Sequence, residues 1–348
     1  MGGGGEVSRL STLTGDLLER GLDRMKLRRA PGRPEQIHLS VTDRCFLPCL
    51  HCDIWKNEAT DLPGSVWSDL IDRLGDWCAP AGMNFVGGEP LLRRDLESLM
   101  AQAVGRGFTV SFNTNGWLVN EQRARAISEA GASIVYVSLD GMERETIDHS
   151  RGKAGSFDKA MAAIDLFDAL PNPRVVIAVV LHGRNAAEIP ALLGWVRKRR
   201  LQMVVQPLYQ NFGYNEYDPD WWKTSELWPH EPEQLAAIDA AIDLLTAERL
   251  RGGPVCNEAT QLQAMKFHFR NPSTDSGLSC RAGHTDLSID PEGRVRLCYF
   301  LEPVGTVFDP TPLPVMWESL TTLRRRYEVS RCERHCNLLN CNFDRGEG

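Results

Sequence analysis

The chain has 348 residues, of which 42% are hydrophobic and 24% charged, and its formal net charge is −7. This composition is typical of a globular protein large enough for one α/β domain and a smaller second domain. No apolar run approaches the roughly 18 residues of a membrane span, the N-terminus lacks a signal-peptide pattern, and the negative charge disfavours nonspecific binding to nucleic acid, so we expect a cytoplasmic protein without membrane or nucleic-acid partners.

Residues 1–35 precede the first predicted strand, and we interpret them as an N-terminal extension. From residue 36 to about 207, short β-rich runs alternate with helical patterns, and each helix follows a strand. The predicted strands are Ile37–Val41, Met83–Val86, Thr109–Phe112, Ser133–Ser138, Val175–Val180 and Met203–Val205. The predicted helices are Ser65–Trp77, Asp95–Arg106, Glu121–Ala130, Ser156–Leu170 and Glu188–Arg199, with a further one over about 233–250. Such βαβ units form parallel sheets, and six of them favour a partial (β/α)6 TIM-like barrel over a flat doubly wound sheet.

The last hundred residues follow a different pattern. Leu287–Ile289 and Val295–Leu297 flank the turn Pro291-Glu292-Gly293, which predicts a β-hairpin. Cysteine-bearing loops close the chain. We therefore divide the protein into the extension 1–35, the barrel with a connecting helix over 36–250, and a C-terminal β-hairpin plus cysteine-rich extension over 251–348.

The cysteines carry the strongest chemical signal. The chain has ten, and in a cytosolic protein of this length they indicate metal binding rather than disulfides. Cys45, Cys49 and Cys52 follow the first strand with the spacing CxxxCxxC. Three thiolates this close can hold an iron–sulfur cube and leave its fourth iron open for a ligand. A zinc site with His51 nearby and a chance arrangement are the alternatives.

Polar turns follow the next three strands. They are Gly87-Gly88-Glu89-Pro90, then Asn113-Thr114-Asn115-Gly116, then Ser138-Leu139-Asp140-Gly141. The glycines allow backbone to approach a ligand, Glu89 or nearby carbonyls can accept hydrogen bonds from an ammonium group, and the short polar side chains can hold a ribose or a carboxylate. Any one of these motifs could be an ordinary turn. In a parallel barrel, however, all four loops lie on one rim, which is where active sites are found.

The cysteine loop and the GGEP turn together resemble the radical S-adenosylmethionine (SAM) superfamily, over roughly residues 36–210. The resemblance implies a [4Fe-4S] cluster on Cys45, Cys49 and Cys52 that reductively cleaves SAM to a 5′-deoxyadenosyl radical, which abstracts a hydrogen atom from the substrate. It also implies SAM contacts, at Gly87, Gly88, Glu89, Pro90, Asn113, Asn115, Ser138, Asp140 and Arg151. Arg151 resembles the family arginine that pairs with the SAM carboxylate.

The C-terminal cysteines resemble the SPASM and Twitch extensions of that family, which carry auxiliary iron–sulfur clusters. Cys280 and Cys298 flank the hairpin, and Cys332, Cys336 and Cys341 follow. Because a full SPASM module has more cysteines, the resemblance favours the shorter Twitch type with one auxiliary [4Fe-4S] cluster. It leaves open which four thiols bind, and a structural zinc site is the alternative.

Cys256 lies between the two cysteine groups. It is either an inert thiol or a hydrogen-atom donor of the kind found in some radical SAM epimerases. Gln206 and Tyr209, at the end of the sixth strand, are predicted to contact substrate. The aromatic residues Tyr217, Trp221 and Trp222 either pack in the core or stack on a ring of the substrate at the barrel mouth.

Two classes of substrate are consistent with these features. The first is a small molecule, such as a carbohydrate or natural-product scaffold, undergoing epimerisation, dehydrogenation or decarboxylation. The alternative is a peptide or protein. Both need an electron donor such as flavodoxin or ferredoxin. A noncatalytic electron carrier or metal-binding module is a third reading, but such a protein would not need the SAM-type motifs.

Overall fold

The computed structural model describes residues 32–58, 60–210 and 216–343. The predicted extension 1–35 therefore lies outside the described residues, except for residues 32–35.

Within these ranges, nine strands form one sheet in the order β6-β5-β4-β3-β2-β1-β7-β8-β9. The first six are mutually parallel, as the βαβ pattern predicts. The strands are β1 (Gln36–Thr42), β2 (Gly82–Gly87), β3 (Thr109–Thr114), β4 (Ile134–Ser138), β5 (Arg174–Leu181), β6 (Gln202–Pro207), β7 (Asp286–Ile289), β8 (Arg294–Arg296) and β9 (Gly305–Thr306). The predicted fold class, a partial barrel followed by a hairpin, is confirmed.

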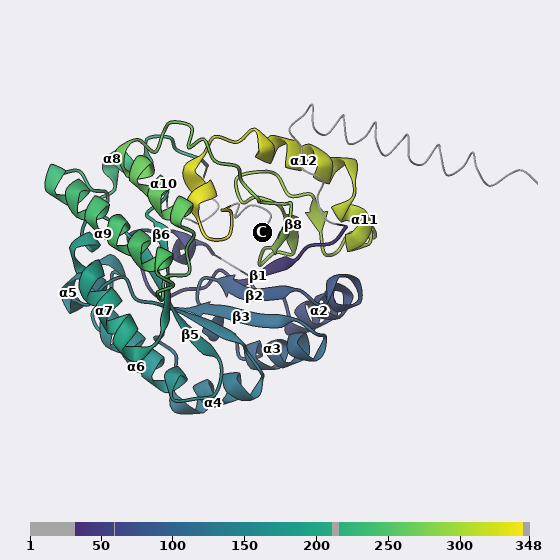
Figure 1. Cartoon of the computed structure of the whole chain (residues 1–348). Coiled ribbons are helices and arrows are strands. Elements are labelled where there is room, and N and C mark those ends of the chain that lie inside the picture. Colours follow the sequence, from purple (N-terminus) through teal and green to yellow (C-terminus); the bar gives the residue numbers. More distant parts are fainter. Residues whose placement is uncertain (1–31, 59, 211–215, 344–348) are drawn as a thin grey trace, which may run out of the picture.

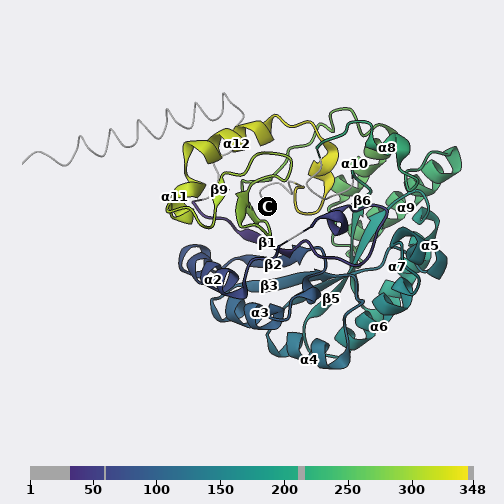
Figure 2. The same ribbon diagram turned by 180° about the vertical axis from the view of Figure 1, so that it is seen from behind.

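Helices lie along the outer side of the curved sheet, and the C-terminal segments fill the side between β1 and β6 (Figures 1 and 2). The barrel helices are α2 (Gly64–Cys78), α3 (Leu96–Gly105), α4 (Glu121–Glu129), α5 (Arg144–Ser150), α6 (Ser156–Asp168) and α7 (Ile189–Arg199). The later helices are α8 (Trp221–Thr224), α9 (Pro232–Leu250), α10 (Ala259–Arg270), α11 (Leu313–Trp317) and α12 (Leu320–Ser330). Short 3-10 turns occur at Ile54–Lys56, Pro90–Leu92, Ala186–Glu188 and His335–Leu338. No helix among the described residues is long and apolar enough to cross a membrane.

The strands alternate between an apolar face and a more polar one. Ile37 and Leu39 of β1 are fully buried in the hydrophobic core, whereas His38 between them is only half-buried. Because successive side chains of a strand point to opposite faces, the buried set packs under the helices and the other set faces the interior of the arc. Burial of the apolar side chains fixes the strands in place. The loops that follow the strands begin at their carboxyl ends.

The predicted hairpin is present and extends the sheet of the barrel. The carboxylate of Asp290 accepts hydrogen bonds from the backbone N–H groups of Glu292 and Arg294, at 3.1 and 2.9 Å, and Gly293 takes the positive φ of 80° that closes the turn. Strand β7 then pairs in parallel with β1, with Gln36 opposite Asp286. The sequence around Pro291-Glu292-Gly293 predicts the turn, but it does not indicate that β7 pairs with β1.

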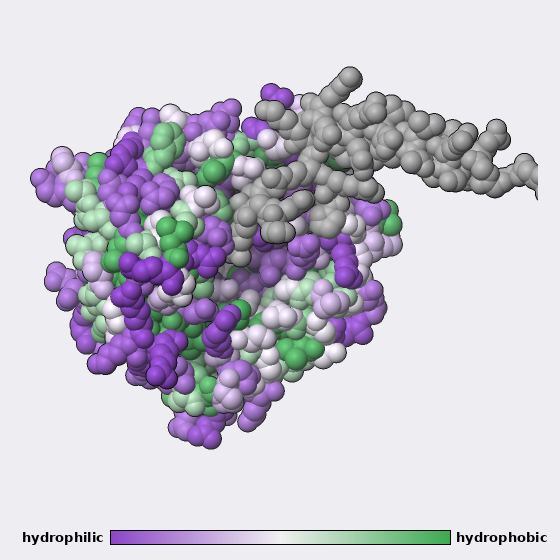
Figure 3. Space-filling view, viewed as in Figure 1, coloured by the Kyte–Doolittle hydropathy of each residue, from purple (hydrophilic) through white to green (hydrophobic). Residues whose placement is uncertain are grey.

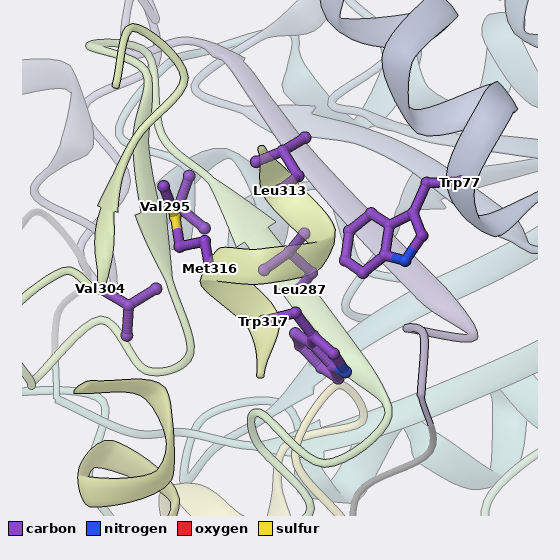
Figure 4. Close-up of a pocket in the computed structure, with 7 residues that line it drawn as sticks. All are labelled: Trp77, Leu287, Val295, Val304, Leu313, Met316 and Trp317. Atoms are coloured by element: carbon purple, nitrogen blue, oxygen red, sulfur yellow. The ribbon is translucent and has the colours of Figure 1, made fainter. Parts of the chain in front are cut away.

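An apolar pocket marks where the extension packs on the barrel (Figure 4). It is lined by Trp77, Leu287, Val295, Val304, Leu313, Met316 and Trp317. The rings of Trp77 and Trp317 meet edge to face, with centroids 6.2 Å apart. Its lining is entirely hydrophobic, so we interpret it as part of the core that joins α2 to α11.

Polar contacts make a second junction between the barrel and the extension, at β6. Asn257 pairs with the backbone of Val205, accepting from its N–H and donating to its carbonyl, both at 2.7 Å. Gln261 donates to the carbonyl of Leu338 at 2.8 Å, and Asn257 and Gln261 both donate to Asn340 at 3.0 Å. Since Asn257 and Gln261 are buried, their pairing fixes the segment around residues 338–340 against the strand.

Candidate functional site

The CxxxCxxC loop leaves the carboxyl end of β1 and rests on the last residue of α5 and the turn that follows it. The Leu50 N–H donates to the Ser150 carbonyl at 2.9 Å. Gly152, at φ +67°, lies so close to the Pro48 carbonyl that a Cβ there would be 2.4 Å from its oxygen. Cys45, Cys49 and Cys52 are each partly buried and none is in a disulfide. The loop is thus held in place by backbone contacts.

The GGEP turn packs directly on this loop. Gly88 N–H donates to the Thr42 carbonyl at 2.7 Å, and Glu89 N–H donates to the Arg44 carbonyl at 2.9 Å. A Cβ on Gly88 would lie 2.3 Å from the Arg44 oxygen, and one on Gly87, at φ +129°, would lie 2.1 Å from the Thr42 oxygen. Both glycines are therefore needed for the close approach of the two loops to each other.

Glu89 connects the second loop to the third. Its side chain is fully buried, accepts from Thr114 Oγ at 2.9 Å and Leu91 N–H at 3.2 Å, and with its second oxygen accepts from Asn115 N–H at 2.8 Å. Burial raises the pKa of Glu89 to about 7, although these hydrogen bonds oppose the shift. Asn115 in turn lies against Cys45, with Nδ2 and Sγ 4.0 Å apart.

Asp140 and Arg151 form a buried ion pair beside the cysteine loop. Arg151 Nη2 lies 2.5 Å from Asp140 Oδ2, and the charge of the guanidinium also acts to lower the pKa of the Cys49 thiol, against the larger effect of burial. Burial acts to raise the pKa of Asp140, but Arg151 and the neighbouring His51 and His182 outweigh it and the net direction is downward. Arg151, which was predicted to pair with the SAM carboxylate, therefore lies beside the cysteine loop. Its charge is balanced by Asp140, another predicted SAM contact.

Two histidines near this pair stand out only in the structure. Burial, together with the charge of Arg151, lowers the pKa of His51 to about 3. His182 is fully buried, and burial lowers its pKa to about 4. Both are therefore neutral at physiological pH. Their position in the sequence contains no signal for this shared environment.

The first three thiols suit an iron–sulfur cluster by the chemistry of the donor set. Burial raises the pKa of Cys45 to about 11 and that of Cys52 to about 12, and the thiolates are close enough to disfavour one another's ionisation. Binding iron would offset this cost of ionising the thiols, because a metal holds its sulfur ligands in the deprotonated form. Among the described residues, no three His, Cys, Asp or Glu side chains are grouped closely enough to hold a single metal ion.

The structure also gathers the five C-terminal cysteines. The charge of Cys336 would interact with those of Cys280, Cys298 and Cys332, while Cys341 lies near Cys298 and the pair Arg281–Asp286. Burial raises the pKa of the Cys280 thiol to about 12 and that of Cys336 well above its ordinary value. Phe300 N–H donates to Cys298 Sγ at 3.4 Å. The donor set fits an auxiliary cluster.

The predicted substrate residues fall into two environments. Tyr209 and Trp221 are buried, at 3% and 8% exposure, and their rings pack 5.6 Å apart. Tyr217 and Trp222 are half-buried, and Arg334 lies 4.1 Å over the ring of Tyr217. Gln206 is half-buried at the end of β6, opposite Val180 of β5. Gln206, Tyr217 and Trp222 are thus more accessible to a substrate than Tyr209 and Trp221.

Cys256 lies beside β6, where its N–H donates to the Met203 carbonyl at 2.8 Å. Met203 is near the beginning of that strand, whereas the loops described above leave the carboxyl ends of their strands. Cys256 therefore lies toward the amino end of β6, whereas the rim is at the carboxyl ends of the strands.

Sequence reasoning missed the polar residues within the strands. His38, Asn84 and Ser111 lie opposite one another across β1, β2 and β3, and Ser111 Oγ donates to Asn84 Oδ1 at 3.1 Å. The alternation of His38, Asn84 and Tyr136 with buried apolar neighbours is the signal that could have identified this inner face. Figure 3 shows a hydrophilic hollow near the middle of this face of the molecule.

Comparison with known proteins agrees with this arrangement. A family model described as the radical SAM superfamily matches residues 39–196. Fe-coproporphyrin III synthase of Methanosarcina barkeri is 34% identical over 171 residues, covering 47% of this chain and 41% of that protein. The chain thus spans less than half the length of this relative.

Two further similarities extend over most of the chain. PqqA peptide cyclase of Gluconobacter oxydans is 24% identical over 304 residues, covering 86% of this chain and 80% of that protein. The solved structure of native anSMEcpe with bound AdoMet and Cp18Cys peptide has a TM-score of 0.63 and 17% identity, covering 88% of this chain and 87% of that one. At 17% identity, this match shows similarity of fold alone.

Proposed function

Because the chain belongs to the radical SAM superfamily, we propose that it uses reductive cleavage of SAM to modify a peptide or protein by hydrogen-atom abstraction. One observation carries the radical chemistry: the cysteine loop, the GGEP turn and the turn after β3 are hydrogen-bonded in series at one end of the sheet, and Asp140 of the turn after β4 pairs with Arg151 beside the cysteine loop. In this proposal residues 36–250 generate the radical and residues 251–348 hold an auxiliary cluster.

The chain's own residues have separate roles in this proposal. Cys45, Cys49 and Cys52 hold a [4Fe-4S] cluster, which when bound supplies the electron that splits the sulfonium of SAM. The GGEP backbone and the carboxylate of Glu89 present acceptors to the SAM ammonium, and Arg151 offers a guanidinium to its carboxylate. Asn113, Asn115, Ser138 and Asp140 line the same rim.

The peptide class is supported by the relative that aligns over most of the chain, which is named for a peptide substrate. The related fold also accommodates a peptide in a solved structure. The comparisons therefore favour the peptide alternative over the small-molecule substrate that the sequence analysis preferred. They give no specific support to epimerisation, or to Cys256 as a hydrogen-atom donor.

Mass spectrometry of peptides tests the substrate class. The reconstituted enzyme, with dithionite or with flavodoxin or ferredoxin as electron donor, is incubated with SAM and short peptides encoded beside its gene. We expect a SAM-dependent change in the mass of one peptide, which the Cys49→Ala variant does not produce. Cleavage of SAM without change to any peptide would contradict the peptide class, and would return attention to small molecules.

A further inference from the structure

Arg334 lies between the barrel rim and the C-terminal cysteines. It is half-buried, two residues after Cys332 and two before Cys336. Its guanidinium carbon lies 4.1 Å from the ring centroid of Tyr217 and 5.2 Å from that of Phe300. The two rings meet edge to face, with centroids 6.1 Å apart. One cation is therefore held by aromatic rings from two other segments of the chain.

The ring of Tyr217 belongs to a segment that is fixed to the barrel. Gln210, three residues after β6, is 6% exposed and bonds to both peptide groups that flank Tyr217. Its Nε2 donates to the Glu216 carbonyl at 2.7 Å, and its Oε1 accepts from the Asp218 N–H at 2.9 Å. Tyr217 is thus tied to the carboxyl end of β6, which is part of the rim.

The other neighbours of Arg334 are fixed on the cysteine side. Phe300 follows Cys298 by two residues, and its N–H donates to that sulfur at 3.4 Å. His335, next to Arg334 in the chain, is fully buried, with its Nδ1 3.0 Å from Nδ1 of His268. Since both flanks are ordered, Arg334 would lose little conformational entropy on binding a ligand.

Stacking leaves the hydrogen-bonding edge of Arg334 unused. An arginine that stacks on a ring uses the face of its planar guanidinium, while its N–H groups point outward in that plane. In the part of the chain that the structure describes, no residue accepts a hydrogen bond from this side chain or forms an ion pair with it, and its nitrogen atoms are open to solvent. A guanidinium edge of this kind matches a carboxylate, which accepts two parallel hydrogen bonds from it.

We propose that Arg334 is a specificity-determining residue that binds a carboxylate of the substrate peptide, from an Asp or Glu side chain or from the peptide C-terminus. The inference rests on the peptide substrate of the proposed function. The chain as a whole is acidic, with a net charge of −7, so an acidic peptide needs a local cation of this kind to bind.

Fluorescence anisotropy tests the inference. The reconstituted full chain, with SAM, is titrated with each fluorescein-labelled peptide encoded beside its gene, and with forms in which one Asp, one Glu or the C-terminus is replaced by its amide. Loss of a hydrogen-bonded charge pair lowers affinity by about tenfold or more, so one amide form should bind wild-type protein that much more weakly and thereby identify the source of the carboxylate. Arg334→Gln should weaken binding of the unmodified peptide by the same factor, and should not weaken binding of that amide form any further.

Arg331→Gln is the matched control. It also removes an arginine close to Cys332 that lies over a ring, 5.7 Å from the centroid of Tyr327, and it should bind both forms as wild type does. Iron analysis shows whether each variant keeps its clusters. If Arg334→Gln loses iron, Arg334→Lys allows the same comparison, because it keeps the charge and removes the planar fork.

The outcomes separate this inference from the proposed function. Affinity that depends jointly on Arg334 and on one peptide carboxylate supports the inference. If Arg334→Gln binds as wild type does, or loses the same affinity for the acid and amide forms, the inference is overturned, and SAM-dependent modification of the peptide would leave the proposed function standing. Joint dependence without any modification would uphold the carboxylate site and contradict the proposed function. Absence of binding by every peptide overturns the inference.

Discussion

Replacing Glu89 by Gln should change how folding stability depends on pH. The ordinary pKa of the carboxyl is 4.5, and burial raises it to about 7 in the folded chain. The folded state therefore binds this proton more tightly than the unfolded state, so stability falls as pH rises from about 4.5 to about 7 and then levels off. From this shift the penalty for an ionised Glu89 amounts to roughly 3 kcal/mol.

The assay is urea unfolding of the metal-free, reduced protein under anaerobic conditions at pH 5 and pH 8. Glu89→Gln loses one acceptor for the Asn115 or Thr114 donor, and this loss does not depend on pH. Relative to wild type, the variant should therefore gain on the order of 3 kcal/mol between pH 5 and pH 8. Groups that titrate in both proteins cancel in the comparison.

Glu129→Gln, at an exposed position on α4, is the control and should show no such gain. If the difference between wild type and Glu89→Gln is the same at both pH values, the reasoning is refuted, because Glu89 would then titrate alike in the folded and unfolded chains.

Three other predictions concern the same rim. Gly88→Ala places a Cβ 2.3 Å from the Arg44 oxygen and should lower the free energy of unfolding by roughly 1–3 kcal/mol in the same urea titration. Gly105→Ala is the control, because the space around its Cβ is open and the substitution should not destabilise the fold. Asp140→Asn leaves the buried guanidinium of Arg151 without its partner and should reduce stability by about 3–5 kcal/mol; equal unfolding midpoints would contradict this. Cys45→Ala should abolish SAM cleavage but keep the iron of the C-terminal thiols, as measured by iron analysis, and complete loss of iron would show that the two sites are not independent.

The order of the helices and strands could be predicted from the sequence, and so could the set of loops that lie on one rim. Alternation of period 2 and period 3.6 identified six βα units, and parallel strands necessarily place the loop after Thr42 and the loop after Gly87 at the same end. The hairpin was predictable because its turn chemistry is local, at Asp290 and Gly293.

Other features were not predictable because they depend on tertiary contacts. The pairing of β7 with β1 requires a match between strands about 250 residues apart, which neither segment encodes alone. Glu89 was predicted to contact SAM, and the sequence contains no signal that its side chain would also be fully buried and bonded to the turn after β3. Tyr209 was predicted to contact substrate, and nothing in the sequence indicates that its ring would pack beside His268 and Phe300.

The central claim is that three thiols after β1 hold a cluster that splits SAM. Formation of 5′-deoxyadenosine, measured by liquid chromatography after anaerobic reconstitution and reduction, tests it most directly. The account predicts SAM-dependent 5′-deoxyadenosine from wild-type protein and none from Cys49→Ala. Iron-loaded wild-type protein that leaves SAM intact, or a Cys49→Ala variant as active as wild type, would contradict it.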